Sequence, residues 1–213
     1  MINFLTNGVV GIAPKATGPA VLYSQNFEGL PLLDLDGQDG WSRVEGAPEK
    51  PFTVDANAQL EGAKNALIGP GSSLTLYRRL LAFPPSYDAE FMLFKEAEGE
   101  FDMNMLVGCG AFLTDNHNVG FDWIVQHISD MFGAMNMRFV VNGWGTEALI
   151  PIPPGATMTC RVERRQGALT SFYVNGGLQW TATTSALLGT RIVLDGNTSN
   201  TSGRADAIRI TAA

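Results

Sequence analysis

Glu100 and Asp102 are the first candidate pair of catalytic carboxyl groups in the sequence. They stand two positions apart in EGEFDMNML, and side chains at positions i and i+2 of a β-strand share one face of the sheet. Two carboxyl groups that face one glycosidic bond can hydrolyse it, since one protonates the leaving oxygen while the other acts as nucleophile or base. The alternative is a pair of solvated side chains on an exposed strand, and we favour that interpretation.

The histidines and cysteines do not complete a nucleophilic site. His117 lies in TDNHNVG, which is typical of a turn, and His127 lies in VQHIS, which is typical of a strand. No G-x-S-x-G elbow accompanies them. Cys109 and Cys160 lie in apolar stretches, which favours two buried free thiols, although the sequence alone leaves a bridge between them open. We therefore expect a protein that is not an enzyme.

The elements that must carry these residues are short β-strands separated by turn signals. Residues 161–184 give the clearest case, because Gln166-Gly167 and Asn175-Gly176-Gly177 join three strand-like runs. Asn-Gly turns supply the positive φ angles that tight hairpins require, so these runs predict an antiparallel meander. Similar runs cover 21–29, the stretch near Phe52, 73–80, 88–96, 101–113, 119–128, 135–143, 190–196 and 205–212. About a dozen strands predict an all-β sandwich of two packed antiparallel sheets.

The chain organisation is that of one domain with an arm. No repeat or change of composition divides residues 21–213. Residues 1–20 mix apolar residues with Gly, Pro and Ala, so they predict an extended N-terminal arm that docks on another chain or packs on the sandwich as an edge strand.

Composition excludes several classes of partner. A net charge of −7 and a pI near 4.8 argue against a nucleic-acid partner, which would need clustered Lys and Arg. The densest basic run, Arg161 to Arg165, is interrupted by Glu163 and is typical of an exposed strand face. No signal peptide is evident, and no apolar run reaches the ~18 residues of a membrane helix. We expect a protein made in a cytoplasm and not held in a membrane.

Short motifs at both ends of the chain resemble the concanavalin A-like lectin/glucanase superfamily, laminin-G-like members included. They are NFEG followed by GW, the hairpin FYVNGGLQWTAT and the closing run SGRADAIRI. The resemblance implies a jelly-roll sandwich whose last strand lies beside its first. Glucanases of the laminarinase type carry a third carboxylate after the first two. Asn104 and Met105 stand where that carboxylate would fall, which argues against hydrolysis.

The resemblance also implies a structural calcium site, because many carbohydrate-binding sandwiches of this kind join first and last strands through Ca²⁺. Glu28 and Asp206 occupy the matching places, although two ligands fall short of the six or so that calcium takes. The acidic run from Asp34 to Gly40 partly matches an EF-hand loop. Asp39 stands where the turn glycine belongs, so an ordinary polar loop is the better interpretation.

Exposed aromatic rings would be the glycan contacts of such a sandwich. Trp144, between glycines in NGWGTE, and Trp180, in the hairpin, are the candidate glycan or protein contacts. Trp41 and Trp123 lie in contexts typical of a core. The alternative is that all four tryptophans anchor the sheets or a protein interface.

Two functions follow from these observations. The first is a structural protein of a tailed-phage virion, such as a capsid decoration or tail accessory protein. It would contact other particle proteins through the arm and form homo-oligomers. The alternative is a free-standing carbohydrate-binding module, and a laminarinase-type glycan hydrolase ranks third.

Overall fold

The structure is a computed structural model of the 213-residue chain. It describes residues 18–45, 51–56, 60–69, 75–95, 103–110, 121–129, 134–141, 146–184, 186, 189–196 and 202–213. Most of the predicted arm, residues 1–20, lies outside the described residues.

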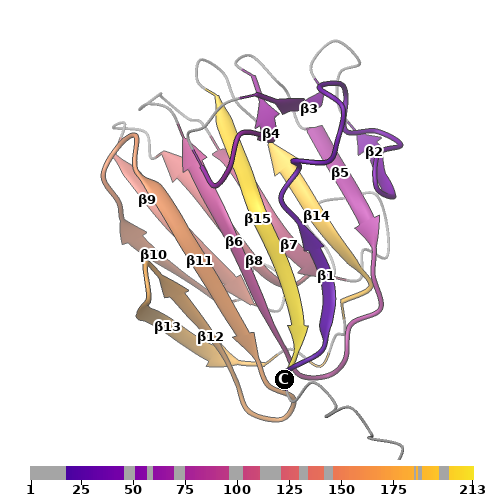
Figure 1. The fold of residues 1–213 in the computed structure, drawn as a ribbon. Coiled ribbons are helices and arrows are strands. Elements are labelled where there is room, and N and C mark those ends of the chain that lie inside the picture. The colour runs from indigo at the N-terminus through magenta and orange to yellow at the C-terminus, as the bar shows by residue number, and fades with distance from the viewer. Residues whose placement is uncertain are drawn as a thin grey trace, which may run out of the picture.

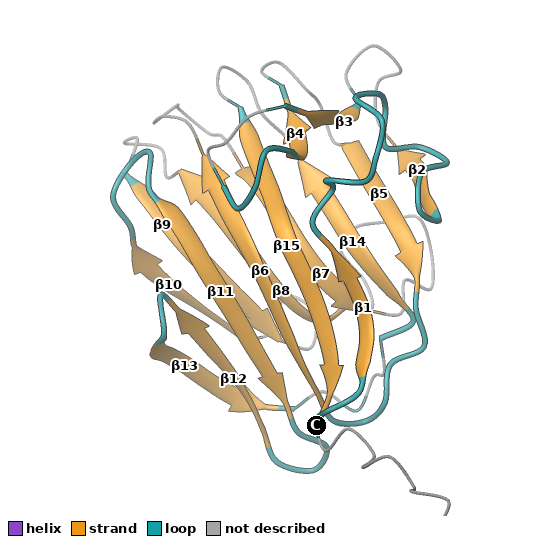
Figure 2. Ribbon diagram, viewed as in Figure 1, coloured by secondary structure: helices purple, strands orange, loops and turns teal. Residues whose placement is uncertain are grey.

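The described residues form fifteen strands and no helix (Figure 2). In chain order they are β1 Val21–Gln25, β2 Trp41–Glu45, β3 Phe52–Asp55, β4 Asn65–Ile68, β5 Thr75–Leu80, β6 Tyr87–Lys95, β7 Met103–Gly110, β8 Phe121–Ser129, β9 Met135–Val141, β10 Thr146–Pro151, β11 Thr157–Arg164, β12 Leu169–Val174, β13 Gly177–Thr183, β14 Arg191–Gly196 and β15 Gly203–Ala212. No helix long and apolar enough to cross a membrane is found among these residues.

Two antiparallel sheets pack face to face, which confirms the all-β jelly-roll sandwich (Figure 1). The front sheet has the order β13-β12-β11-β6-β15-β4-β3, and β1 pairs with the lower half of β15. The back sheet has the order β10-β9-β8-β7-β14-β5-β2. The pairing of β1 with β15 confirms that the last strand lies beside the first.

The predicted meander is confirmed as β11, β12 and β13, paired in that order. Asn175 and Gly176 both have positive φ, at 50° and 79°, which is the turn geometry that their sequence favours. The sequence missed β2, β4 and β10. These are short, and β10 ends at Pro151, which limits it to the edge of a sheet.

The core lies between the sheets and is made of alternate strand residues. Trp41 and Trp123 are 1% exposed, as predicted. Trp123 stacks on Phe91 across the sandwich, with ring centroids 6.1 Å apart. Cys160 is a buried free thiol, as expected, and burial raises its pKa. The side chain of Cys109 lies outside the described residues.

The two sheets approach closely at Gly196 in β14. A Cβ atom there would lie 2.4 Å from Cδ1 of Ile68, a fully buried core residue of β4. Gly196→Ala is therefore expected to destabilise the protein by ~1–3 kcal/mol, because an overpacked core must shift. Gly69→Ala is the matched control, since its Cβ would meet nothing within 4 Å. Denaturant unfolding measures both, and equal stabilities would contradict the close approach.

Candidate functional site

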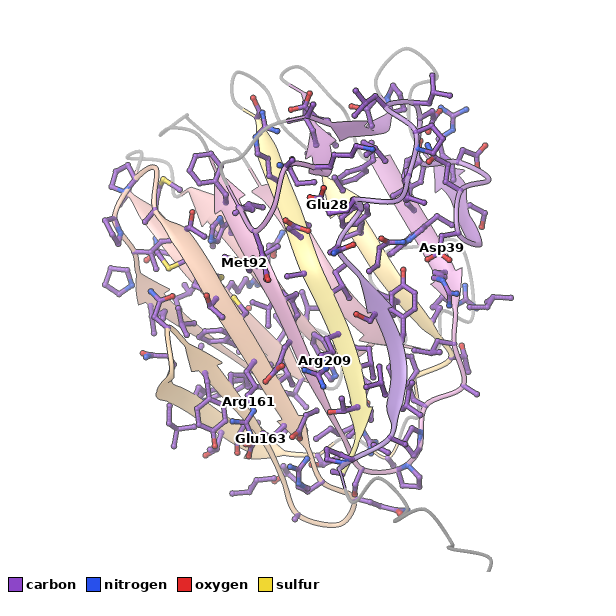
Figure 3. All side chains as sticks on the ribbon, in the orientation of Figure 1. Glu28, Asp39, Met92, Arg161, Glu163 and Arg209 are labelled. Atoms are coloured by element: carbon purple, nitrogen blue, oxygen red, sulfur yellow. The ribbon has the colours of Figure 1, made fainter. Side chains whose placement is uncertain are left out.

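A groove of about 930 Å³ lies on the outer face of the front sheet. Its floor comes from β1, β15, β6, β11 and β12, and its upper end is formed by Asn26 and Glu61. Figure 3 shows Met92, Arg161 and Arg209 on this front sheet. The lining residues are Ser24, Gln25, Asn26, Glu61, Glu90, Phe91, Met92, Thr159, Cys160, Arg161, Tyr173, Gly176, Ala207 and Arg209.

One row of side chains crosses the floor of the groove. The strand register places Tyr173 beside Arg161, Arg161 beside Glu90, Glu90 beside Arg209, and Arg209 beside Ser24. Paired residues on adjacent strands point to the same face, about 4.8 Å apart. A phenol ring, two guanidinium groups, a carboxylate and a hydroxyl therefore line up across five strands.

Arg161 is held in place by its neighbours. Its guanidinium forms an ion pair with Glu163 and lies 3.6 Å from Asp88. It also lies over the ring of Tyr173, 5.4 Å from the centroid, while the Tyr173 hydroxyl donates to Glu163 at 3.2 Å. Arg165 pairs with the same Asp88 at 2.6 Å. This network neutralises the charge of Arg161 and fixes the ring of Tyr173 at the groove wall.

Glu90 and Arg209 differ from Arg161 because both are exposed and open to the groove. Within the part of the chain that the structure describes, neither side chain makes a hydrogen bond or ion pair. A carboxylate acceptor and a five-donor guanidinium thus stand side by side without internal partners. Such a pair can exchange its bound water for ligand hydroxyl groups at little cost in broken protein contacts.

Asp206 is buried at the upper end of the groove, where β15 makes a bulge between Asp206 and Arg209. Its Oδ1 accepts a hydrogen bond from the Ala207 amide at 2.7 Å, and its Oδ2 is buried with no hydrogen-bond partner in the part of the chain that the structure describes. Burial, together with the nearby carboxylates of Glu61 and Glu28, raises the pKa of Asp206 to about 7, against the opposing effect of the Ala207 and Glu61 backbone amides. The carboxylate charge of Asp206 is therefore poorly compensated by the protein itself.

Glu28 lies at the same end of the front sheet (Figure 3), close enough to Asp206 to raise its pKa, and it holds the loop before β4. Its Oε1 accepts from the amides of Ala63 and Lys64 at 2.6 and 2.8 Å. The Lys64 ammonium donates to the carbonyl oxygens of Glu28 and Leu30 at 3.0 and 2.8 Å. Glu28 is thus already partly engaged by backbone donors.

Glu28 lies close enough to Asp206 to raise the pKa of its carboxyl group. The orphaned Oδ2 of Asp206 is the feature that a cation would satisfy. Among the described residues, however, no three Asp, Glu, His or Cys side chains are placed to hold a metal ion. A calcium ion would need backbone carbonyl oxygens or water for its remaining ligands. The calcium site therefore stays a prediction, and Asp206 is its main candidate ligand.

The predicted aromatic contacts lie outside the groove or outside the described residues. Trp180 is half-buried and stacks on Phe172, with centroids 5.4 Å apart, at the edge of the core. Trp144 is not among the described residues, nor are Glu100 and Asp102. The roles assigned to these residues stay predictions.

The other sequence candidates are structural where they are described. His127 is buried in β8, and His117 lies outside the described residues. In the acidic loop, Asp34 accepts from the Asp36 amide at 2.9 Å, and Asp39 accepts from Tyr23 at 3.1 Å. These carboxylates stabilise the loop, as expected of an ordinary polar loop.

Sequence reasoning missed the row in the groove. Its members lie on strands that were expected, at alternate positions of DAEFM, CRVER, SFYV and IRI. The alternation is a signal for an outward face. Which outward residues meet depends on the register between strands far apart in the sequence.

Solved structures provide the comparison, since the sequence matches no protein-family model and no curated protein. The globular domain of T. cruzi calreticulin aligns at 8% identity, covering 91% of this chain and 88% of that one, with a TM-score of 0.70. A carbohydrate esterase of the Shiga toxin-encoding bacteriophage phi24B aligns at 12% identity over 92% and 99%, with a TM-score of 0.61. The carbohydrate recognition domain of Emp47p aligns at 14% identity over 94% and 99%, with a TM-score of 0.57. These similarities establish a lectin-like β-sandwich fold.

Proposed function

We propose that this protein binds a carbohydrate in the groove on its front sheet, without cleaving it. The observation that carries the proposal is the row Tyr173–Arg161–Glu90–Arg209, in which the side chains of Glu90 and Arg209 have no partner among the described residues. A lectin-like sandwich supports a binding role, and one of the similar structures is a carbohydrate recognition domain.

The chemistry of the row suits a sugar. Glu90 accepts hydrogen bonds from ligand hydroxyl groups, and Arg209 donates to hydroxyl or ring oxygens. Tyr173 and Met92 offer apolar surface for the C–H face of a pyranose. Arg161 is already neutralised by Glu163 and Asp88. With Glu90 and Arg209 balancing one another, the groove favours an uncharged saccharide.

The neighbours of Glu90 support binding without hydrolysis. Cleavage of a glycosidic bond needs two carboxyl groups that face the scissile bond. In the row, Glu90 is flanked by Arg161 and Arg209 instead. We therefore propose a non-catalytic module, in which the ligand is recovered unchanged.

Calorimetric titration with a panel of neutral oligosaccharides tests this function. We expect at least one to bind the wild type, and Glu90→Gln and Arg209→Ala each to weaken that binding roughly 10- to 100-fold, since hydrogen bonds to charged groups contribute ~1.5–3 kcal/mol. Glu147→Gln is the control, because Glu147 is exposed on the back sheet. Unchanged affinity in both groove variants, or release of reducing ends from the ligand, would refute the proposal.

A virion role is the second candidate, and the bacteriophage phi24B protein favours it, because the alignment covers almost the whole of that chain. In this proposal the module decorates a capsid or tail, the N-terminal residues 1–20 contact neighbouring particle proteins, and the groove faces outward. Co-purification of the protein with virus particles would support the role. Purified particles that do not contain the protein would contradict it.

We further propose that a calcium ion binds at Asp206 and stabilises the upper end of the groove. The support is the buried Oδ2 of Asp206, which has no hydrogen-bond partner among the described residues, and the proximity of the Glu28 and Glu61 carboxylates. When bound, the ion would supply the positive charge that this cluster lacks.

A further inference from the structure

Strand β13 forms an open edge of the front sheet. An edge strand presents unpaired N–H and C=O groups, and proteins protect such edges with charges, prolines, bulges or covering loops. The described strands include five at sheet edges, namely β1, β2, β3, β10 and β13. Of these, β13 is the least protected.

The other edges are covered or interrupted. On β3, the Leu35 amide donates to the Phe52 carbonyl at 2.8 Å, and the Val54 amide donates to Leu33 at 2.9 Å. On β2, the Trp41 carbonyl accepts from the Gly37 amide at 2.9 Å.

The remaining two edges are protected by irregularity, charge or proline. On β1, the pairing is irregular between Val21 and Tyr23, and the Tyr23 hydroxyl is tied to Asp39 of the adjoining loop. On β10, Glu147 places a charge on the edge, and Pro151 ends the strand.

Among the described residues, β13 carries such a device only near its start. No charged residue occurs between Arg165 and Arg191, the longest uncharged stretch of the chain. A register shift beside Gln179 interrupts the pairing near the turn, but Trp180 to Thr183 pair regularly with β12. Apart from Gln179, which donates to the Gly177 carbonyl, no described residue bonds to the outer side of β13. Thr181 and Thr183 are exposed there.

We propose that β13 pairs with β13 of a second copy of this chain, antiparallel and edge to edge, to form a two-fold dimer. Each copy carries a net charge of −7, so two copies repel one another overall. The uncharged β13 edge is where they can approach without opposing like charges. An antiparallel pair of identical strands is self-complementary, as an isologous interface requires.

The dimer has a consequence for binding, which rests on the proposed function. A two-fold axis that relates antiparallel edge strands runs perpendicular to the sheet, so both grooves open on the same side. The two sites would then engage a multivalent glycan together and increase its apparent affinity. The dimer itself does not depend on that function.

Sedimentation equilibrium from micromolar to millimolar protein tests the interface. We expect a reversible monomer–dimer equilibrium that strengthens with added salt, which screens the repulsion between the two chains. Thr181→Lys should weaken dimerisation at least about tenfold, because it sets like charges against each other across the paired strands. Thr183→Lys should act in the same way, so the result does not depend on one variant folding.

Gln166→Lys adds the same charge in the exposed turn between β11 and β12, away from the β13 edge, and serves as the matched control. It should leave the equilibrium near that of the wild type. A wild type that stays monomeric throughout, a dimer that both threonine substitutions leave intact, or a control that dissociates equally would each overturn the proposal. A wild-type dimer that fails to bind glycans would refute the proposed function alone.

Discussion

Replacing Arg164 by methionine is expected to destabilise the protein by about 3–5 kcal/mol, because it leaves the buried carboxylate of Asp122 without its ion-pair partner. Arg164 in β11 and Asp122 in β8 join the two sheets through an ion pair whose side chains are 1% and 0% exposed. Tyr87 donates to the same carboxylate at 3.2 Å and accepts from Trp123 at 2.7 Å. Burial already raises the pKa of Asp122 to about 6, against the opposing effect of Arg164.

The double variant Arg164→Met with Asp122→Asn separates charge from packing. If the loss of stability in Arg164→Met comes from the unpaired carboxylate of Asp122, neutralising that carboxylate should restore part of the stability. The effects of the two substitutions on the free energy of unfolding will then not be additive. Denaturant unfolding near neutral pH measures all three variants. Glu147→Gln is the control, since its exposed pair with Arg138 should contribute less than ~1 kcal/mol. An equal loss of stability on breaking the Arg164–Asp122 and Arg138–Glu147 ion pairs would show that the buried ion pair does not join the sheets as described.

This ion pair also shows a limit of the sequence analysis. The run from Arg161 to Arg165 was predicted to be an exposed strand face, and Arg161 and Glu163 do face outward. Arg164 follows the strand alternation inward and is buried. The prediction was wrong for Arg164 because its partner, Asp122, lies on the other sheet, and no local pattern connects the two.

The fold was more predictable than the groove, for a physical reason. Strand alternation and Asn-Gly turns are local signals, so they were sufficient for the β11–β13 meander and for the core positions of Trp41 and Trp123. The row in the groove joins β1, β6, β11, β12 and β15, which are distant in the sequence. Its composition depends on strand order and register, which those local signals do not determine.

The resemblance supplied a piece of topology that local signals could not, and it brought Glu28 and Asp206 into the same prediction. It implied that the first and last strands are neighbours, which the β1–β15 pairing confirms. The third carboxylate, Glu61, was not foreseen. It reaches the cluster from the loop before β4, a strand too short to stand out in the sequence.

The effect of Asp206→Asn on stability is expected to change sign when calcium is added. In chelator, Asp206→Asn should melt above the wild type, because the amide removes a buried charge that lies near the Glu28 and Glu61 carboxylates. In calcium the order should reverse, because the wild type gains the binding free energy and the variant loses its ligand. At a calcium concentration 100-fold above Kd, that gain is about 2.7 kcal/mol.

Thermal melts of both proteins in EDTA, in CaCl2 and in MgCl2 decide the question. Magnesium should stabilise the wild type less than calcium does, because it demands octahedral geometry and dehydrates reluctantly. Glu147→Gln is the control, since it removes an equal charge from the back sheet and should respond to calcium as the wild type does. If the wild type melts at one temperature in all three solutions, Asp206 holds no ion. Its raised pKa would then leave it as an uncompensated buried acid, and Asp206→Asn should stabilise the protein in every solution.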